Sequence, residues 1–437
     1  MFPTSRRVLL GAAASIAASI MPGRPAMAQG RMPTPRPVRI GCLVALTGAQ
    51  EVIGGPILDG AQIAAEQINK AGGVLGRTIE IVPFDVHADP QTAVAGAREL
   101  TGLGVNLLCG VLSSEVGLAL APMLQPANAV LITCAAASEK LTHEAFTPNL
   151  FRVSDQTYMR NRAQARLMAE RYPEVTRWGA IIPDVEYGRS AYASFRAGLL
   201  EAYPAIAKRD PEFVEPVVAR FGETDFKAQL AALRAGGAEG LFIAIYGDDA
   251  ISFYRQSHLA GLMRSVKVLA DATNEFLVPL SLGTGTPEHL WLGMSWYYGG
   301  YQKLPMGKKL YDDYVKRTGN GLPLGFLSAG HSAVYAYAAA IRKAGNTDTK
   351  PVIAALEGLT FDTAKGKVTL RPEDHQAICD VNFIRIKASE VEPTMDILDY
   401  SRPDVEVAEF VRYDGASVIE PPTPGKPVVY PSKLSER

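Results

Sequence analysis

Short apolar runs alternate with stretches of helical spacing along most of this chain. The first run, at residues 40–48, is followed by a stretch at 59–70 in which apolar residues recur at i, i+3, i+4 and i+7. This spacing predicts a helix with one buried face, which Gly72-Gly73 end because glycine adopts the left-handed conformation cheaply. A second apolar run at 79–84 ends at Asp85. The order predicts the β-α-β beginning of a parallel sheet.

The same alternation continues to residue 387 and starts afresh at Trp178. Further strands are expected at 105–109, 130–134, 150–153, 178–183, 212–218, 240–245, 266–270, 290–295, 366–370 and 381–387. Helices are expected at 91–103, 116–124, 159–171, 188–203, 226–235, 249–260, 307–318, 329–344 and 350–356. Two β/α series of this kind predict an α/β protein with two lobes, each a mostly parallel sheet flanked by helices.

The glycines and polar residues of the first unit also resemble a known family. The matching residues are Leu46-Thr47-Gly48, Gly55, Asp59-Gly60, Ala64, Ile68-Asn69, Gly72-Gly73, Gly76 and Asp85, with Ser114, Tyr187-Gly188 and Asp374-His375-Gln376 further on. This order resembles the leucine/isoleucine/valine-binding type of periplasmic solute receptor. No single element is specific to the family, but the ordered set is.

The resemblance implies the type I periplasmic-binding fold, in which the chain crosses three times between two lobes. Mapped onto this sequence, the crossings are expected near 150–153, 273–282 and 361–366. Lobe 1 then comprises residues 38–152 plus 283–360, and lobe 2 comprises 153–282 plus 361–400. Residues 401–437 are expected to form an extended tail that wraps the second lobe.

The first 28 residues have the features of an export signal. Arg6-Arg7 precede a 14-residue apolar run, and Ala26-Met27-Ala28 form an A-x-A cleavage site. The run is too short to span a membrane, so a soluble periplasmic protein exported by a twin-arginine signal is expected. Removal of the signal takes three arginines and shifts the formal charge from −1 to −4. This balance argues against a nucleic-acid partner.

Neither a metal site nor a cofactor site is expected. The six histidines lack the H-x-x-x-H and Cys/His spacings of zinc sites, and no G-x-S-x-G, G-x-x-x-x-G-K or G-x-G-x-x-G motif occurs. Cys42, Cys109 and Cys134 lie in apolar runs, which favours buried free thiols over a Cys109–Cys134 bridge. An enzyme is therefore not indicated.

Candidate ligand-binding residues follow the strands of the first lobe. Ser114 precedes an apolar helix, where a hydroxyl and free backbone N–H groups can either cap the helix or hold a carboxylate. The resemblance favours the carboxylate, and it implies further contacts at Ala135, Ala136 and Ala137. The amino-acid receptors of this family usually carry Thr or Ser where this chain has Ala137.

Three further candidates follow strands of the second lobe. Tyr187 and Tyr246 offer large apolar faces that could cover a ligand. Asp271 aligns with the acidic residue that binds the ammonium group in amino-acid receptors. It could therefore meet an amino group, or be tied to hinge donors and leave the cleft apolar. The second arrangement, with an aromatic or aliphatic carboxylate as ligand, is favoured over a branched-chain amino acid.

The resemblance implies an extracytoplasmic receptor of an ABC importer. A small ligand would be enclosed by hinge closure, and the closed monomer would dock on a membrane permease. Two alternatives remain at this point, a ligand-sensing subunit of a signalling system and an exported amidase-like enzyme. The second would need a nucleophile–base pair that the sequence does not show.

Overall fold

The computed structural model describes residues 35–387 and 405–429. The predicted signal at 1–28 lies outside these residues, as do 401–404 and 430–437 of the predicted tail. Within the described residues, no helix combines the length and the apolar character that crossing a membrane requires.

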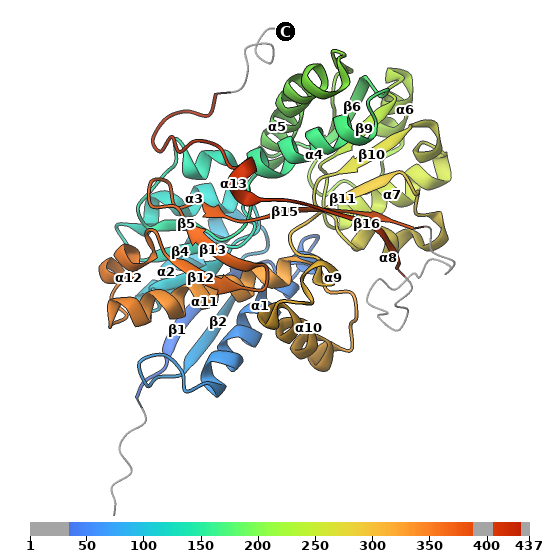
Figure 1. The fold of residues 1–437 in the computed structure, drawn as a ribbon. Coiled ribbons are helices and arrows are strands. Elements are labelled where there is room, and N and C mark those ends of the chain that lie inside the picture. The colour runs from blue at the N-terminus through green and yellow to red at the C-terminus, as the bar shows by residue number, and fades with distance from the viewer. Residues whose placement is uncertain (1–34, 388–404, 430–437) are drawn as a thin grey trace, which may run out of the picture. The chain divides into compact units, whose positions relative to one another are not determined.

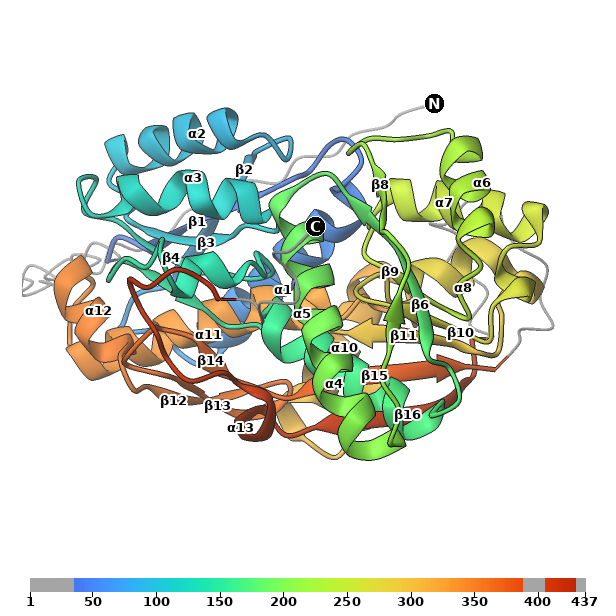
Figure 2. The same ribbon diagram turned by 90° about the horizontal axis from the view of Figure 1, so that it is seen from above.

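The first lobe is built on a parallel sheet of five strands in the order β2–β1–β3–β4–β5. The strands are β1 (Val38–Val44), β2 (Ile79–Asp85), β3 (Leu107–Gly110), β4 (Val130–Thr133) and β5 (Leu150–Arg152). Its helices are α1 (Glu51–Lys70), α2 (Pro90–Gly102), α3 (Ser114–Leu124), α11 (Phe326–Ala344) and α12 (Thr349–Leu356). Figure 2 shows α2 and α3 on one side of the sheet and α1 and α11 on the other. Alternate strand residues such as Cys42 and Leu43 consequently enter two different cores.

The second lobe is built on an eight-stranded sheet in the order β16–β15–β11–β10–β9–β6–β7, with β8 also paired to β6. The strands are β6 (Arg177–Pro183), β7 (Glu212–Phe213), β8 (Val217–Ala219), β9 (Gly240–Ile243), β10 (Val268–Asp271), β11 (Leu290–Met294), β15 (Val381–Ile386) and β16 (Val407–Tyr413). Its helices are α4 (Thr157–Arg171), α5 (Glu186–Ala202), α6 (Lys227–Gly236), α7 (Asp248–Ala260) and α8 (Leu277–Leu282). Figures 1 and 2 show α4 and α5 on one side of this sheet and α6 and α7 on the other. Only β15 and β16 run antiparallel to their neighbours.

The remaining elements lie between and beside the two sheets. A small antiparallel sheet contains β12 (Thr360–Thr363), β13 (Gly366–Leu370) and β14 (Ala377–Ile378). The other helices are α9 (Tyr298–Tyr301), α10 (Pro305–Thr318) and α13 (Gly415–Val418). Helix α10 packs against α1, and β12 packs against α11.

Two lobe assignments made from the sequence are wrong. The strand at 290–294 was placed in the first lobe, but it pairs in parallel with β10 and stays in the eight-stranded sheet. Residues 361–370 were placed in the second lobe, but β12 packs against α11 and β13 pairs with β12. The chain therefore returns to the first lobe after Met294 and leaves it again between Ile378 and Val381. Which sheet receives a fully apolar strand depends on long-range pairing, which the local pattern does not encode.

Helix α1 begins earlier than the sequence predicts. Helical spacing was recognised only from residue 59, but the helix starts at Glu51 and includes Gly54 and Gly55. A Cβ atom at Gly54 would lie 1.9 Å from the carbonyl oxygen of Ala45. Gly54 is thus required for the close approach of the helix to the end of β1, and not for a turn.

The C-terminal segment crosses from the second lobe to the first. Strand β16 pairs with β15 at the edge of the eight-stranded sheet, as expected of a tail on the second lobe. The chain then continues past α13, where Glu420 Oε1 lies 2.8 Å from His143 Nε2. The Gly425 N–H donates to the His143 carbonyl oxygen over 2.8 Å. This segment therefore contacts both lobes, which the sequence did not predict.

All four cysteines are buried free thiols. Cys42 and Cys109 are register partners on the adjacent strands β1 and β3, whereas Cys134 follows the end of β4. Burial raises the pKa of Cys134 above its usual range, so the thiol stays protonated.

Candidate functional site

A cavity lies where the two lobes meet, at the carboxyl ends of the first-lobe strands. The first lobe contributes Ile53, Leu112, Ser114, Ala135 and Ala137. The second contributes Tyr187 and Tyr246, with Thr273 from the loop after β10. The remaining wall comes from residues 154–157, from Arg160 and Asn161 of α4, and from Ser295 and Phe326. The space is about 550 Å³, counting the crevices between atoms and the opening to solvent.

Ser114 is the first residue of α3 and lines the cavity. The cap of α3 is the neighbouring Ser113, whose hydroxyl accepts from the Val116 N–H. Ser114 Oγ instead accepts a hydrogen bond of 3.1 Å from the Ser138 N–H. A hydroxyl carries one donor besides its acceptor sites, so Ser114 keeps its O–H for another partner. The first turn of α3 also carries the positive end of the helix dipole.

The alanine loop after β4 contributes less than predicted. Ala135 and Ala137 line the cavity, but Ala136 is packed in the core with α3. The N–H groups of Ala135 and Ala136 both donate to the Val111 carbonyl oxygen over 3.2 Å. These two amides are therefore already engaged within the protein, and Ala136, one of the three predicted contacts, does not line the cavity. The Ala137 carbonyl oxygen accepts from the Thr157 N–H over 3.0 Å.

Tyr187 and Tyr246 form an aromatic corner of the cavity. Their ring centroids are 5.3 Å apart and the ring planes are perpendicular. The hydroxyl of Tyr246 accepts a hydrogen bond of 3.1 Å from Gln50 Nε2, which links the two lobes. Burial raises the pKa of the Tyr246 hydroxyl far above its usual range. The two tyrosines thus present neutral faces and edges to the cavity.

Asp271 does not line the cavity. Its carboxylate is fully buried and accepts from the N–H groups of Thr273 and Asn274, from Asn274 Nδ2 and from the Tyr254 hydroxyl, over 2.7–2.9 Å. Burial raises its pKa, and these hydrogen bonds oppose the rise. The assignment of Asp271 as a ligand-binding residue is therefore wrong. The sequence analysis left two arrangements open for Asp271, contact with a ligand amino group or hydrogen bonding to nearby protein donors. The structure has the second.

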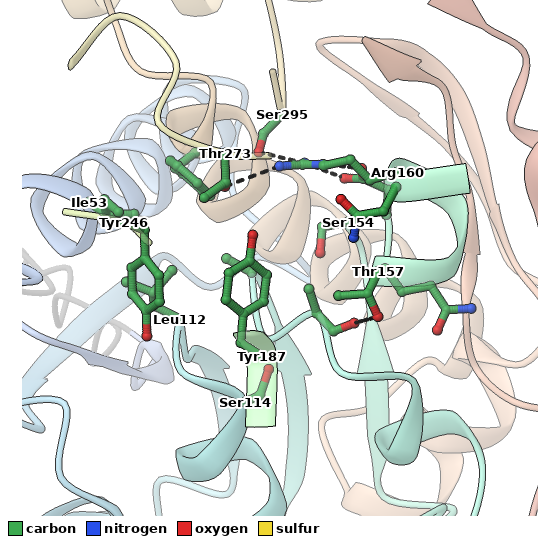
Figure 3. Close-up of a pocket in the computed structure, with 16 residues that line it drawn as sticks. Ile53, Leu112, Ser114, Ser154, Thr157, Arg160, Tyr187, Tyr246, Thr273 and Ser295 are labelled. Atoms are coloured by element: carbon green, nitrogen blue, oxygen red, sulfur yellow. Dashed lines mark hydrogen bonds and ion pairs between the residues drawn. The ribbon is translucent and has the colours of Figure 1, made fainter. Parts of the chain in front are cut away.

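The sequence analysis missed an ion pair at the cavity wall. Arg160 Nε and Nη2 donate to the two carboxylate oxygens of Asp155 over 2.6 and 2.7 Å. The other N–H groups donate to the Ala272 carbonyl oxygen and to the hydroxyls of Thr273 and Ser295. All five guanidinium donors are therefore used within the protein, and Arg160 joins α4 to two strand ends (Figure 3). The only signal in the sequence was that α4 carries polar residues on every face.

Polar contacts also join the two lobes through residues that do not line the cavity. Lys140 Nζ lies 2.9 Å from Glu186 Oε2, and the Ser138 hydroxyl donates to Glu186 Oε1 over 3.2 Å. The Glu186 N–H donates to the carboxylate of Glu115 in return. On the other side, the Asp248 N–H donates to the Ala49 carbonyl oxygen over 3.3 Å. These contacts hold the lobes together around the cavity.

A model of a protein family, described as periplasmic binding protein, matches residues 37–390. The leucine-, isoleucine-, valine-, threonine- and alanine-binding protein of Pseudomonas aeruginosa is 28% identical over 71% of this chain and 79% of its own length. A Leu/Ile/Val-binding protein homolog of Brucella melitensis is 26% identical over 76% of this chain and 86% of its own length.

Solved structures show the same fold. The closed form of a leucine-, isoleucine-, valine-, threonine- and alanine-binding protein from Brucella ovis has a TM-score of 0.74 at 18% identity, covering 90% of this chain and 100% of its own. A solute-binding protein of an ABC transporter from Rhodopseudomonas palustris, in complex with 3,4-dihydroxy benzoic acid, has a TM-score of 0.73 at 20% identity, covering 87% and 98%. These comparisons confirm the fold class predicted from the sequence.

Proposed function

The chain belongs to the periplasmic binding protein family of solute receptors, and from this premise we propose that it binds a small carboxylate for an ABC importer. The carboxylate is aromatic or aliphatic and carries no α-ammonium group. The curated relatives are named as amino-acid-binding proteins, so the proposal departs from them in ligand class. The fold itself takes an aromatic acid in the protein from Rhodopseudomonas palustris.

Ser114 is the observation that carries the proposal. Its hydroxyl is positioned by the Ser138 N–H, is 1% exposed, and faces the cavity from the first turn of α3. A carboxylate there accepts the O–H hydrogen bond and lies at the positive end of the helix. Tyr187 and Tyr246 cover the apolar body of the ligand.

The charges around the cavity argue against an amino acid as ligand. Among the described residues that line it, the only carboxylate is Asp155, which Arg160 neutralises. The Asp271 carboxylate accepts hydrogen bonds from the backbone of its own loop, and the Ala137 side chain has no hydroxyl. A buried ammonium group would therefore lack a partner of opposite charge, which is costly.

Calorimetry with benzoate, 2-methylpropanoate and leucine tests the ligand class. We expect one of the acids to bind and leucine not to bind. Ser114→Ala should weaken binding of that acid by about 1.5–3 kcal/mol, the scale of a hydrogen bond to a charged group. Ser113→Ala is the matched control, because it removes the helix cap and costs about 1 kcal/mol of stability without touching the ligand. Tight leucine binding with no response to the acids would overturn the proposal.

We further propose that binding closes the two lobes about their three connections. No chemical step is required, because the ligand only shifts the population toward the closed form. The receptor is then a periplasmic monomer, exported by the twin-arginine signal at 1–28, that delivers its ligand to a membrane permease without a nucleic-acid partner. Loss of acid uptake by cells on deletion of the gene supports import. Unchanged uptake with altered gene expression supports sensing instead.

A further inference from the structure

Two polar atoms in the cavity wall have no hydrogen-bond partner among the described residues. They are Ser154 Oγ, between β5 and α4, and Asn161 Oδ1 in α4. Ser154 is 6% exposed and Asn161 is 1% exposed. A buried polar group without a partner typically costs about 1–3 kcal/mol, so a pair of them in one cavity requires an explanation.

Neighbouring polar side chains of the wall do have partners. The Thr157 hydroxyl donates to the Glu139 carboxylate over 3.0 Å. The five N–H groups of Arg160 are all used, two of them on the hydroxyls of Thr273 and Ser295. Ser154 and Asn161 therefore differ from the groups around them, and what they lack must come from inside the cavity.

Ser154 lies away from the Ser114 end of the cavity. In Figure 3, Ser114 is drawn toward the end of the Tyr187 ring opposite its hydroxyl, whereas Ser154 is drawn toward the hydroxyl end, below Arg160. A ligand held by its carboxylate at Ser114 and covered by Tyr187 would point its far end toward Ser154.

We propose that Ser154 and Asn161 bind a hydroxyl group of the ligand, which makes the ligand a hydroxylated carboxylate. A hydroxyl both donates and accepts, so it can donate to Asn161 Oδ1 while it accepts from the Ser154 O–H. The same group satisfies the Asn161 amide if the amide is turned over. A methyl group of similar size can do neither. This inference rests on the proposed function, because the carboxylate at Ser114 sets the direction of the ligand.

The test is calorimetry with benzoate, with 3- and 4-hydroxybenzoate, and with the two methylbenzoates of matching shape. In the wild-type protein, one hydroxybenzoate should bind at least about tenfold more tightly than its methyl counterpart, because a site built to bind a hydroxyl leaves its polar groups unpaired with the analogue. Ser154→Ala should reduce that preference to less than about threefold, and Asn161→Ala is the second variant that should do so.

Ser257→Ala is the matched control. Ser257 Oγ is also buried without a partner among the described residues, but it lies on α7 and does not line the cavity. The hydroxyl preference should survive this change. Equal binding of hydroxy and methyl acids would overturn the hydroxyl site while leaving the carboxylate receptor intact. Failure of every acid to bind would overturn the proposed function as well.

Discussion

Glu139 couples the contact between the lobes to pH. Its carboxylate is 2% exposed and accepts from the hydroxyls of Thr157 in α4, over 3.0 Å, and Ser194 in α5. Burial raises its pKa from 4.5 to about 7, and the charge of Glu420 acts in the same direction. The two hydroxyls and His143 oppose the rise without cancelling it.

The raised pKa fixes both the sign and the size of the pH effect. Between pH 4.5 and 7 the folded protein holds a proton on Glu139 that the unfolded chain has released. The contribution of Glu139 to stability is therefore complete below pH 4.5 and is lost as pH rises through 7. A difference of about 2.5 in pKa corresponds to roughly 3 kcal/mol. Glu139→Gln keeps an acceptor for both hydroxyls but removes the titration.

Urea unfolding followed by the fluorescence of the buried tryptophans measures the effect. The free energy of unfolding of Glu139→Gln, relative to wild type, should rise by roughly 3 kcal/mol between pH 4.5 and pH 8. Comparing the two proteins at each pH cancels the titration of groups that Glu139 does not influence, but not that of His143, whose pKa the Glu139 charge raises. Glu201→Gln, a change to an exposed carboxylate on α5, is the control that leaves Glu139 in place. A constant difference for Glu139→Gln would refute the argument.

Two further changes test the packing and the polar loop. Gly60→Ala would place a Cβ 1.9 Å from the Leu327 carbonyl oxygen, so it should force α1 from α11 and lower stability by about 1–3 kcal/mol in thermal unfolding. Gly55→Ala, on the same helix with open space around it, should raise stability by up to about 1 kcal/mol. Equal effects of the two substitutions would contradict the close packing of α1 against α11 at Gly60. Asp271→Asn should cost about 1–3 kcal/mol of stability, because it disrupts four hydrogen bonds. Calorimetry should show the affinity for the acid unchanged within about threefold, whereas a loss of affinity without a loss of stability would place Asp271 at the ligand.

Most of the secondary structure could be predicted because each element carries its own local pattern. The helix at 159–171 was predicted within two residues of α4 (Thr157–Arg171), and the strand at 178–183 within one residue of β6 (Arg177–Pro183). Strand β11 was also predicted, but its lobe was not. All five residues of β11 are buried, so the hydrophobic pattern would be the same in either sheet. Only the pairing with β10 determines that β11 belongs to the second lobe.

The site was predictable where it follows strand ends. Ser114, Tyr187 and Tyr246 come from such positions and do line the cavity. Ser154 also follows a strand, β5, but the sequence analysis did not select it, and Asn161 comes from a helix whose polar residues are buried by tertiary packing. A polar residue in a helix normally indicates a position exposed to solvent. The sequence around Asn161 therefore gives no sign that this side chain faces a cavity.

The position of β16 has a consequence for the order in which the molecule is assembled. A chain leaves the ribosome from its N-terminus, and β16 at 407–413 is made long after the β6 strand of the same sheet. Until β16 emerges, β15 is an exposed edge with unpaired backbone groups, which is a template for aggregation. The second lobe can therefore complete its sheet only at the end of synthesis. A chain truncated before residue 405 should aggregate during expression even though the cavity residues are all present.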